Sequence, residues 1–458
     1  MMDQIYKGAL LTLVALSGDS AEAGLPRAST YGNTSRWQIP KCQTHGRIGS
    51  LELMTVLPTL QQQVKTSIWA SRSWTYQEAL LSPRCLFFTA EQIYFECNAM
   101  QCCESLDDST SAYHRSSQSK LDSLAFGCAC HDTTEHALGR GIFRNPMAGA
   151  KDQGKRAFVK HRQYHYDEIV TKYSQRNMKF QSDALAACSA VLLELQQAGF
   201  KDKFIWGLPK EILGQALMWN LKGVGNRRFS FPSWSWVGWE GELERALPTW
   251  SEPVRPSGNP TFLAWYFGRG EWRLLTYYDF ETMIPPYYRG LGTDPIYDAL
   301  QRRSRRLPFD ESLFSQDDLS KLLLIEGLIV TIPLRGRRSV RHIDEMTAQK
   351  RQDYENNGDA TAGPWLGFTI QGEEFYLECR NYHVLRRLLN MSRVDLLLIE
   401  RFKPRVYDFL VIKRTGWGTA VRLECTRLRA SDSFPDGYES TRKLFADNGA
   451  TLEYIALE

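Results

Sequence analysis

The sequence predicts a mixed α+β protein, because the spacing of its apolar residues is typical of helices in some segments and of strands in others. Residues 1–104 alternate short helical and strand-like stretches, which indicates a partial α/β unit. Residues 161–250 show a helical period and end in a tryptophan-rich segment, and residues 251–458 carry short apolar or alternating runs between turn residues. Between them, residues 105–160 are rich in Ser, Asp, Gly and Thr, and we expect a variable, partly disordered insertion there.

Composition favours a soluble globular protein of two or three domains. The 458 residues are 43% hydrophobic and 24% charged, and the net charge of +4 is nearly balanced. Nothing in the charge pattern therefore indicates a nucleic-acid or membrane partner. The sequence has no stretch of about 18 consecutive apolar residues, so no membrane span is predicted. Seven of the ten cysteines lie between Cys42 and Cys130, which is not a compact disulfide framework, so we expect reduced thiols and a cytoplasmic location.

The first residues allow two interpretations. The apolar run over residues 9–16, followed by Ala21-Glu22-Ala23, imitates a secretory signal with its cleavage site. Asp3 and the Gly18-Asp19 pair do not fit such a signal. The alternative is a short helix from Asp3 to Gly8 that leads into a buried strand from Leu10 to Leu16 and a turn. We favour the helix and strand.

Three helices are predicted between residues 161 and 220. The first has apolar residues at helical spacing, at Tyr166, Ile169, Val170 and Tyr173. The second follows a capping Ser182 or Asp183 and has an apolar stripe made of Leu185, Cys188, Val191, Leu192 and Leu195. Pro209 suits the first turn of a third helix that reaches about Asn220.

A strand is predicted for the Trp-rich segment from Phe231 to Trp239. Trp234 and Trp236 would share one face of it. Two tryptophans beside apolar neighbours favour a structural core wall between domains, and the alternative is a stacking platform for a sugar or a base. Further strands are predicted at Leu322–Pro333, Trp365–Ile370, Glu374–Cys379, Val394–Ile399, Tyr407–Lys413 and Ala420–Cys425.

The most informative stretch runs from Arg72 to Cys97. A helix with an arginine at each end is followed by two short aromatic runs that predict a hairpin. The residues that define the motif are Arg72, Trp74, Gln77, Glu78, Ser82 and Arg84. Glu78 is a candidate catalytic acid or electrostatic clamp for a nucleotide. The alternative, which we favour, is a capping box in which Thr75 and Glu78 stabilise the start of the helix.

The two arginines of this motif also allow two roles. Arg72 and Arg84 could hold a carboxylate or phosphate group of a ligand. We favour internal salt bridges to Glu78 or Glu96. A zinc site is not predicted, because Cys97, Cys102, Cys103, Cys128, Cys130, His131 and His136 lack paired ligand spacing. The nucleotide-binding and hydrolase glycine motifs are absent, and no cofactor is predicted.

Several of these motifs together resemble the fungal heterokaryon incompatibility (HET) domain. They are the helix, strand and Gly-Leu-Pro of residues 2–26 and the Arg72–Cys97 motif, followed by Tyr173–Arg176, Asp183–Ala187, Trp206–Leu208 and Pro232–Trp236. The family's domain opens with an earlier Tyr-x-Trp-Gly strand and a Trp-Ile-Asp strand. Neither precedes Met1, so the resemblance implies a HET domain truncated at its N-terminus.

The resemblance implies a function in fungal non-self recognition. A HET domain would trigger growth arrest or programmed cell death, and the C-terminal region would sense or regulate, with another protein as the partner. HET domains have been compared with the TIR fold, in which a helix glutamate acts in NAD cleavage. An NAD-cleaving enzyme that uses Glu78 is therefore one alternative. A truncated, inactive relative that binds full-length proteins as a partner or decoy is the other, and the missing strands favour it over the enzyme.

Overall fold

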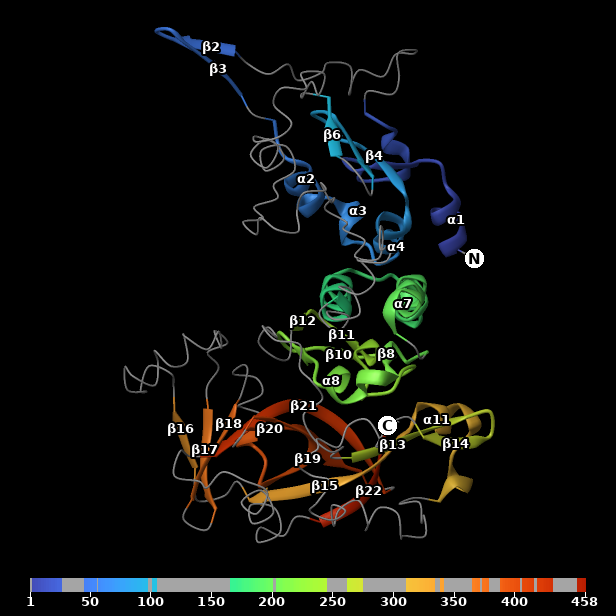
Figure 1. Ribbon diagram of the computed structural model, residues 1–458, viewed down its shortest axis with the longest axis vertical. Helices are drawn as coiled ribbons and strands as arrows, with labels where there is room; N and C mark the ends of the chain where they lie inside the picture. The colour runs from blue at the N-terminus through green and yellow to red at the C-terminus, as the bar shows by residue number, and fades with distance from the viewer. Residues whose placement is uncertain are drawn as a thin grey trace, which may run out of the picture. The chain divides into compact units, whose positions relative to one another are not determined.

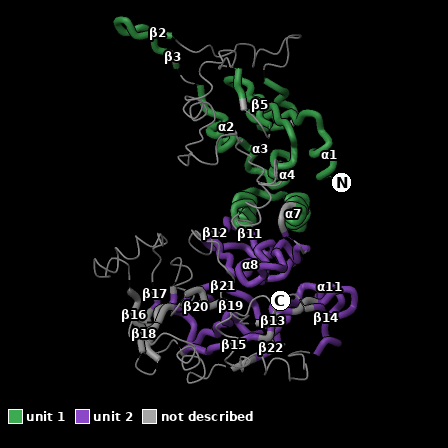
Figure 2. Tube along the Cα trace, in the orientation of Figure 1, with its two compact units in different colours: residues 1–199 green, residues 200–458 purple. Residues whose placement is uncertain are grey.

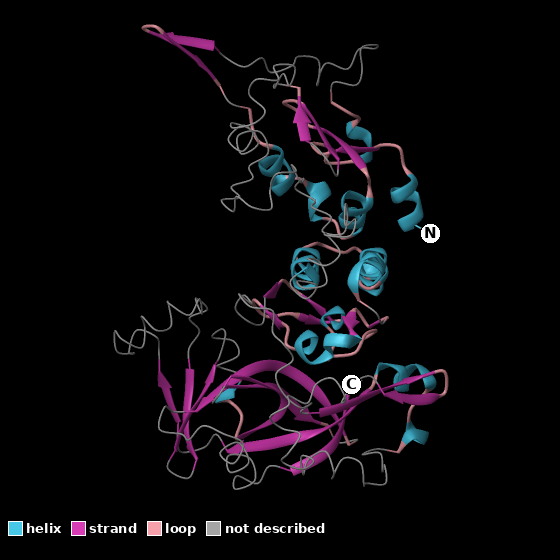
Figure 3. Cartoon of the chain, viewed as in Figure 1, coloured by secondary structure: helices cyan, strands magenta, loops and turns pink. Residues whose placement is uncertain are grey.

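The computed structural model describes residues 2–26, 45–55, 57–97, 101–104, 165–200, 203–244, 262–274, 310–333, 338–341, 365–370, 373–378, 388–403, 406–415, 418–430 and 451–458. Helices and several sheets are both present, which confirms the mixed α+β class (Figures 1 and 3). The chain divides into two compact units, residues 1–199 and residues 200–458 (Figure 2). This boundary lies inside the predicted segment 161–250. The insertion predicted over residues 105–160 lies outside the described residues.

Unit 1 is built on a four-stranded sheet with the order β1-β4-β5-β6. Strand β1 (Thr12–Ala15) pairs in parallel with β4 (Arg84–Phe88), and β5 (Ile93–Cys97) and β6 (Gln101–Cys103) follow antiparallel. Helix α1 (Met2–Gly8) precedes β1. The predicted helix and strand are both present, and so is the hairpin at the end of the motif. The strand was expected to be buried, and this is wrong in part: Val14 and Leu16 are buried, whereas Leu10, Leu11 and Leu13 are exposed.

Three short helices connect β1 to β4 and shape the core of unit 1. They are α2 (Leu60–Thr66), α3 (Ile68–Ser71) and α4 (Trp74–Leu81). The apolar side of α2 packs with the sheet in one buried cluster of Val14, Leu16, Leu60, Val64, Cys85, Phe87, Tyr94 and Cys103. The hairpin β2 (His45–Ile48) and β3 (Leu51–Met54) comes before α2. Gly49 makes its turn possible, because its φ of 62° is unfavourable for other residues.

Two longer helices complete unit 1. The first spans residues 165–174, and its predicted apolar positions Tyr166, Ile169, Val170 and Tyr173 are all buried. The second, α7 (Ala186–Gly199), follows the 3-10 turn η2 (Gln181–Asp183) and buries Cys188, Val191 and Leu195. Helix α7 packs against α4, and α1 contacts both. Both predicted helices are confirmed.

Unit 2 contains a ring of five strands. They are β15 (Leu323–Pro333), β19 (Arg393–Lys403), β20 (Val406–Arg414), β21 (Thr419–Ala430) and β22 (Thr451–Leu457). Consecutive strands pair antiparallel from β15 to β21. Strand β22 closes the ring, because it pairs antiparallel with β15 and in parallel with β21. One buried hydrophobic cluster on these strands includes Val330, Leu396, Phe409 and Val411, all at most 5% exposed.

Further strands extend this ring into a ten-stranded sheet. On one side lie β13 (Phe262–Gly268) and β14 (Glu271–Leu274), and on the other β18 (Glu373–Glu378), β17 (Trp365–Ile370) and β16 (Arg338–Arg341). The six predicted strands are all present. The sequence did not predict β13, β14, β16 or β22. The 3-10 turn η5 (Glu311–Leu313) and helix α11 (Gln316–Lys321) lead into β15.

The first part of unit 2 consists of short elements around the tryptophans. They are β7 (Phe204–Ile205), β8 (Leu208–Pro209), α8 (Leu213–Leu217), β9 (Asn220–Leu221), β10 (Asn226–Arg227), η4 (Trp236–Gly238), β11 (Trp239–Glu240) and β12 (Leu243–Glu244). The predicted helix from Pro209 to Asn220 is wrong in extent, because a 3-10 turn and five α-helical residues occupy it. None of the described helices is long and apolar enough to span a bilayer.

The predicted tryptophan strand is also wrong. Residues 231–235 form turns and Trp236–Gly238 form a 3-10 helix. The Ser235 hydroxyl accepts a hydrogen bond from the Val237 amide and so caps this short helix. A serine that bonds to the backbone in this way competes with strand pairing, and this explains why alternating tryptophans did not produce a strand.

Candidate functional site

The start of α4 differs from the predicted capping box. The helix begins at Trp74 with Ser73 at the N-cap, and no side chain caps it. Thr75 is already inside the helix, and its hydroxyl lies 2.6 Å from the Trp69 carbonyl and 2.7 Å from the Arg72 carbonyl. Glu78 lies one turn further on. The capping-box prediction for Thr75 and Glu78 is therefore wrong, because the helix starts two residues too early for it.

A distant segment positions the helix start instead. Residues 72 and 177 form a parallel β-bridge, in which the Ser73 amide donates to the Asn177 carbonyl at 3.0 Å. The neighbouring residue Arg176 also contacts the helix start. Its Nη1 donates to the Arg72 carbonyl at 3.1 Å and to the Thr75 hydroxyl at 3.0 Å. The guanidinium carbon also lies 4.7 Å above the centre of the Tyr76 ring, a cation–π contact. The Tyr173–Arg176 motif thus folds onto the Arg72–Glu78 motif.

Glu78 is half-buried, and the Tyr6 hydroxyl of α1 hydrogen bonds to its carboxylate. Burial, together with the charge of Glu78 and this hydrogen bond, raises the pKa of Tyr6 to about 12, and the nearby Arg72 acts in the opposite direction. Burial lowers the pKa of Arg176 to about 10, and Glu78 is one of the groups that oppose this shift. Glu78 therefore interacts electrostatically with elements from α1, α4 and the 165–177 segment.

The predicted salt bridges of the two motif arginines are wrong for the described residues. Arg72 is exposed and makes no ion pair there. Arg84 begins β4, is also exposed, and donates to the Leu10 carbonyl at 3.4 Å. Of these two arginines, Arg72 is the one that acts electrostatically on Tyr6, the hydrogen-bond partner of Glu78. The structure thus brings Arg72 and Glu78 to one place and leaves Arg84 at the opposite end of α4.

The other motif residues, Trp74, Gln77 and Ser82, lie within helix α4 or at its end. Trp74 is half-buried at the first helical position. Ser82 ends the helix: its hydroxyl donates to the Glu78 carbonyl at 2.6 Å and lies 2.7 Å from the Thr12 hydroxyl of β1. Gln77 is 1% exposed, and its buried amide nitrogen has no hydrogen-bond partner among the residues that the structure describes. A buried donor without an acceptor is costly, so Gln77 needs another explanation than packing alone.

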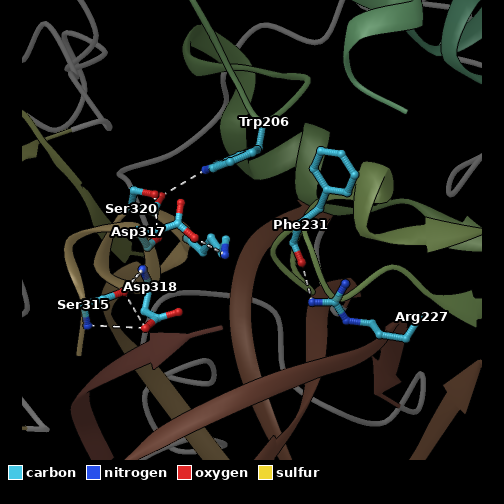
Figure 4. A network of polar contacts seen from close by, with 8 residues as sticks. Trp206, Arg227, Phe231, Ser315, Asp317, Asp318 and Ser320 are labelled. Atoms are coloured by element: carbon cyan, nitrogen blue, oxygen red, sulfur yellow. Dashed lines mark hydrogen bonds and ion pairs between the residues drawn. The ribbon is translucent and has the colours of Figure 1, made fainter. Parts of the chain in front are cut away.

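Two tryptophans of unit 2 connect its short elements to helix α11. The Trp206 indole donates to the Ser320 carbonyl at 3.0 Å, and the Trp234 indole donates to the Lys321 carbonyl at 2.8 Å. Both carbonyls belong to the last turn of α11, where helix carbonyls lack partners within the helix. Figure 4 shows Trp206 directed at Ser320, and Arg227 directed at the carbonyl of Phe231.

Further indoles satisfy other backbone groups of the same segment. Trp236 donates to the Gly207 carbonyl, Trp219 to the Trp234 carbonyl and Trp239 to the Ser233 carbonyl. Trp234 is 0% exposed and Trp236 is 3% exposed. Tryptophans this deeply buried cannot stack on a sugar or a base, so they belong to the core of unit 2. The fully buried Arg422 of β21, 3.6 Å from the Trp219 ring centre, completes this core, and the sequence did not point to it.

No metal centre is found in the part of the chain that the structure covers, where no three His, Cys, Asp or Glu side chains gather. Cys97, Cys102 and Cys103 lie on the neighbouring strands β5 and β6. Cys128, Cys130, His131 and His136 lie outside the described residues.

The arrangement on α4 brings together four groups with chemical capacity. Tyr6 and Glu78 form a hydrogen-bonded acid pair, and Arg72 and Arg176 supply guanidinium groups beside it. Such a set can bind a ligand that carries oxyanions and hydroxyl groups, and a carboxylate can transfer a proton. Tyr6 and Arg176 were not among the predicted site residues. Both lie in segments that resemble the family, but nothing in the sequence shows which segments meet.

Comparison with known proteins adds one finding. Residues 1–78 match the family model described as heterokaryon incompatibility protein (HET). The matched range lies within unit 1 and includes Tyr6, Arg72 and Glu78. No curated protein matches the chain. No solved structure matches it either.

Proposed function

We propose that this chain, a HET-domain protein, acts in non-self recognition in fungi, where its activation leads to growth arrest or programmed cell death. The observation that carries the proposal is the HET match over residues 1–78, which falls inside a unit that is compact by itself. An effector that folds as a separate unit can be controlled by the rest of the chain. Fold alone does not assign function, so the proposal depends on the family.

We assign the regulatory role to unit 2. It has its own closed barrel and a core of its own, so it can fold and bind independently of the HET unit. Its partner in this proposal is another protein in the cytoplasm. A decoy role, in which the chain binds other HET-domain proteins without activity of its own, is the alternative that the same experiment addresses.

A second function, cleavage of a nucleotide such as NAD, is favoured by one specific observation. Glu78 was expected to act as a helix cap, and the structure gives it no such role. Its half-buried carboxylate instead contacts the Tyr6 hydroxyl. A partly accessible carboxylate that does not cap its helix and lies beside a tyrosine hydroxyl is the kind of group that catalysis requires.

The proposal is tested by inducible expression of the full chain in a filamentous fungus, with radial growth and cell viability as readouts. We expect growth arrest with the wild-type chain and none with Trp234→Ala, which removes a buried core residue of unit 2. Normal growth with wild-type chain at a verified protein level would overturn the effector function. Normal growth combined with suppression of the arrest caused by another HET-domain protein would establish the decoy role instead.

A further inference from the structure

Two arginines at the start of α4 have no acidic partner in contact. Among the residues that the structure describes, neither Arg72 nor Arg176 makes an ion pair. Within the described ranges, Arg176 uses only Nη1 for its hydrogen bonds, both to neutral oxygens. The planar guanidinium has five N–H donors, so most of the donors of Arg176 have no protein acceptor in this region.

The environment of Arg176 makes this lack of a counter-ion significant. The side chain is half-buried, and its guanidinium lies against the Tyr76 ring. A cation that is partly removed from water loses hydration, and a bound anion can replace the lost interactions. The cation–π contact and two hydrogen bonds fix its position in advance, so little side-chain freedom would be lost on binding.

Glu78 acts electrostatically on Arg176, but its carboxylate is bound to another group. Its carboxylate accepts the hydrogen bond of Tyr6 and makes no ion pair with either arginine among the described residues. Arg72 acts on Tyr6, and Glu78 acts on Arg176, so both guanidinium groups lie within electrostatic range of the Tyr6–Glu78 pair. The start of α4 adds the positive end of a helix dipole on the same side as Arg72 and Thr75.

We propose that Arg72 and Arg176 together bind an oxyanion group, a phosphate or a carboxylate, of a small-molecule ligand at the start of α4. Arg176 is the preformed part of the site, and the exposed Arg72 closes on the ligand from the solvent side. Tyr6 and Glu78 lie beside the anion and can contact hydroxyl groups of the same ligand. The binding site itself does not depend on the proposed function. The role of the ligand as the signal or substrate of the HET unit does rest on it.

Isothermal titration calorimetry of the purified full chain tests the site with two probes, pyrophosphate for phosphate groups and tricarballylate for carboxylates. We expect saturable binding of at least one probe, and the preferred probe identifies the chemistry of the ligand. Arg72→Gln removes a charge from an exposed side chain and should weaken binding ~10-fold or more at an unchanged melting temperature, as expected for loss of a charged hydrogen bond. Arg84→Gln is the matched control, since it removes an exposed arginine at the other end of α4.

Arg176→Lys provides a second arm, because lysine keeps the charge but not the bidentate fork. We expect weaker binding by this variant with unit 1 still folded. Absence of saturable binding with both probes would overturn the proposal, and so would equal losses in Arg72→Gln and Arg84→Gln, which would indicate a general charge effect. Binding lost in Arg72→Gln while growth arrest persists would refute the role as signal or substrate, and would leave the proposed function intact.

Discussion

Arg176 donates a hydrogen bond to the Thr75 hydroxyl at 3.0 Å across 101 positions of sequence. Thr75 would otherwise be free to cap the helix, but its hydroxyl faces the Trp69 and Arg72 carbonyls and accepts from Arg176. The start of α4 is thus set by a contact with a distant segment. The same contact places a guanidinium group beside Glu78, so one interaction serves both the fold and the candidate site.

Replacement of Arg176 by alanine should destabilise the region around α4. The change removes two hydrogen bonds and a cation–π contact, which together correspond to about 1–3 kcal/mol. Amide hydrogen exchange of residues 72–81 measures the effect locally, which matters because a chain of two units need not unfold in one step. Lys172→Ala is the control, since that exposed side chain forms an ion pair with Glu168 one turn away, and such surface pairs contribute little to stability. Equal exchange in both variants would contradict the structural role of Arg176.

Trp234 should separate the contribution of ring packing from that of its hydrogen bond. Trp234→Ala leaves a cavity in the core of unit 2 and should cost ~3–5 kcal/mol. Trp234→Phe keeps most of the ring but leaves the Lys321 carbonyl without its indole donor, and should cost ~1–3 kcal/mol. Phe229→Ala is the control, because Phe229 is 84% exposed. Urea unfolding followed by far-UV circular dichroism gives the comparison, and a neutral Trp234→Ala would place this side chain outside the core.

Gly207 should not tolerate alanine. Its φ is 83°, and an added Cβ would lie 3.0 Å from side-chain atoms of Trp236 and Val237. The left-handed backbone and the crowding together predict a loss of roughly 1–3 kcal/mol. Gly223→Ala is the matched substitution, because nothing lies within 4 Å of its Cβ position. We expect a lower melting temperature for Gly207→Ala only, and a similar shift in both variants would refute the role of this turn.

Much of the fold could be predicted because local patterns were strong. The stripe of α7 buries Cys188, Val191, Leu192 and Leu195, as their spacing indicated, and the apolar run that became β1 buries Val14 and Leu16. The six predicted strands of unit 2 were found because each is a short apolar or alternating run. Strand β22 was missed, although it closes the barrel. Its pairing with β15 and β21 is a contact between distant segments, which periodicity does not show.

The candidate site was predictable only in part. Arg72 and Glu78 stand in one motif, but their environment depends on Tyr6 from α1 and on Arg176 from the next helical segment. The capping prediction failed because tertiary contacts moved the helix start to Trp74. The tryptophan strand failed for a similar reason, since Ser235 caps a 3-10 helix in place of strand pairing. Local sequence preference is a weak guide where side chains bond to the backbone.

The buried thiols predict that stability falls at alkaline pH. Burial raises the pKa of Cys188 to about 12, from an ordinary value of 9.0. The folded state therefore keeps this proton where the unfolded chain has lost it. Stability is unaffected below pH 9 and decreases as the pH rises toward 12, by about 1.4 kcal/mol per pH unit for one such group. In Cys188→Ala the free energy of unfolding should depend less steeply on pH between 9 and 11. Parallel slopes for wild type and variant would contradict a raised pKa.

Replacement of Glu78 by glutamine decides between the two proposed functions. Glutamine keeps the shape of the side chain and can still accept the Tyr6 hydrogen bond. Because Glu78 does not cap the helix, we expect the fold to be unchanged. If the carboxylate transfers a proton in NAD cleavage, the same change should lower the rate ~10²-fold or more. The measurement is NAD consumption by purified protein, together with growth arrest in the fungal host at equal protein level. Arg84→Gln, at the start of β4, serves as a control for the loss of a charge elsewhere in unit 1. NAD loss with the wild type that disappears only with Glu78→Gln would make this protein an enzyme, and arrest that persists in both variants without NAD loss would assign the effect to binding by the HET unit.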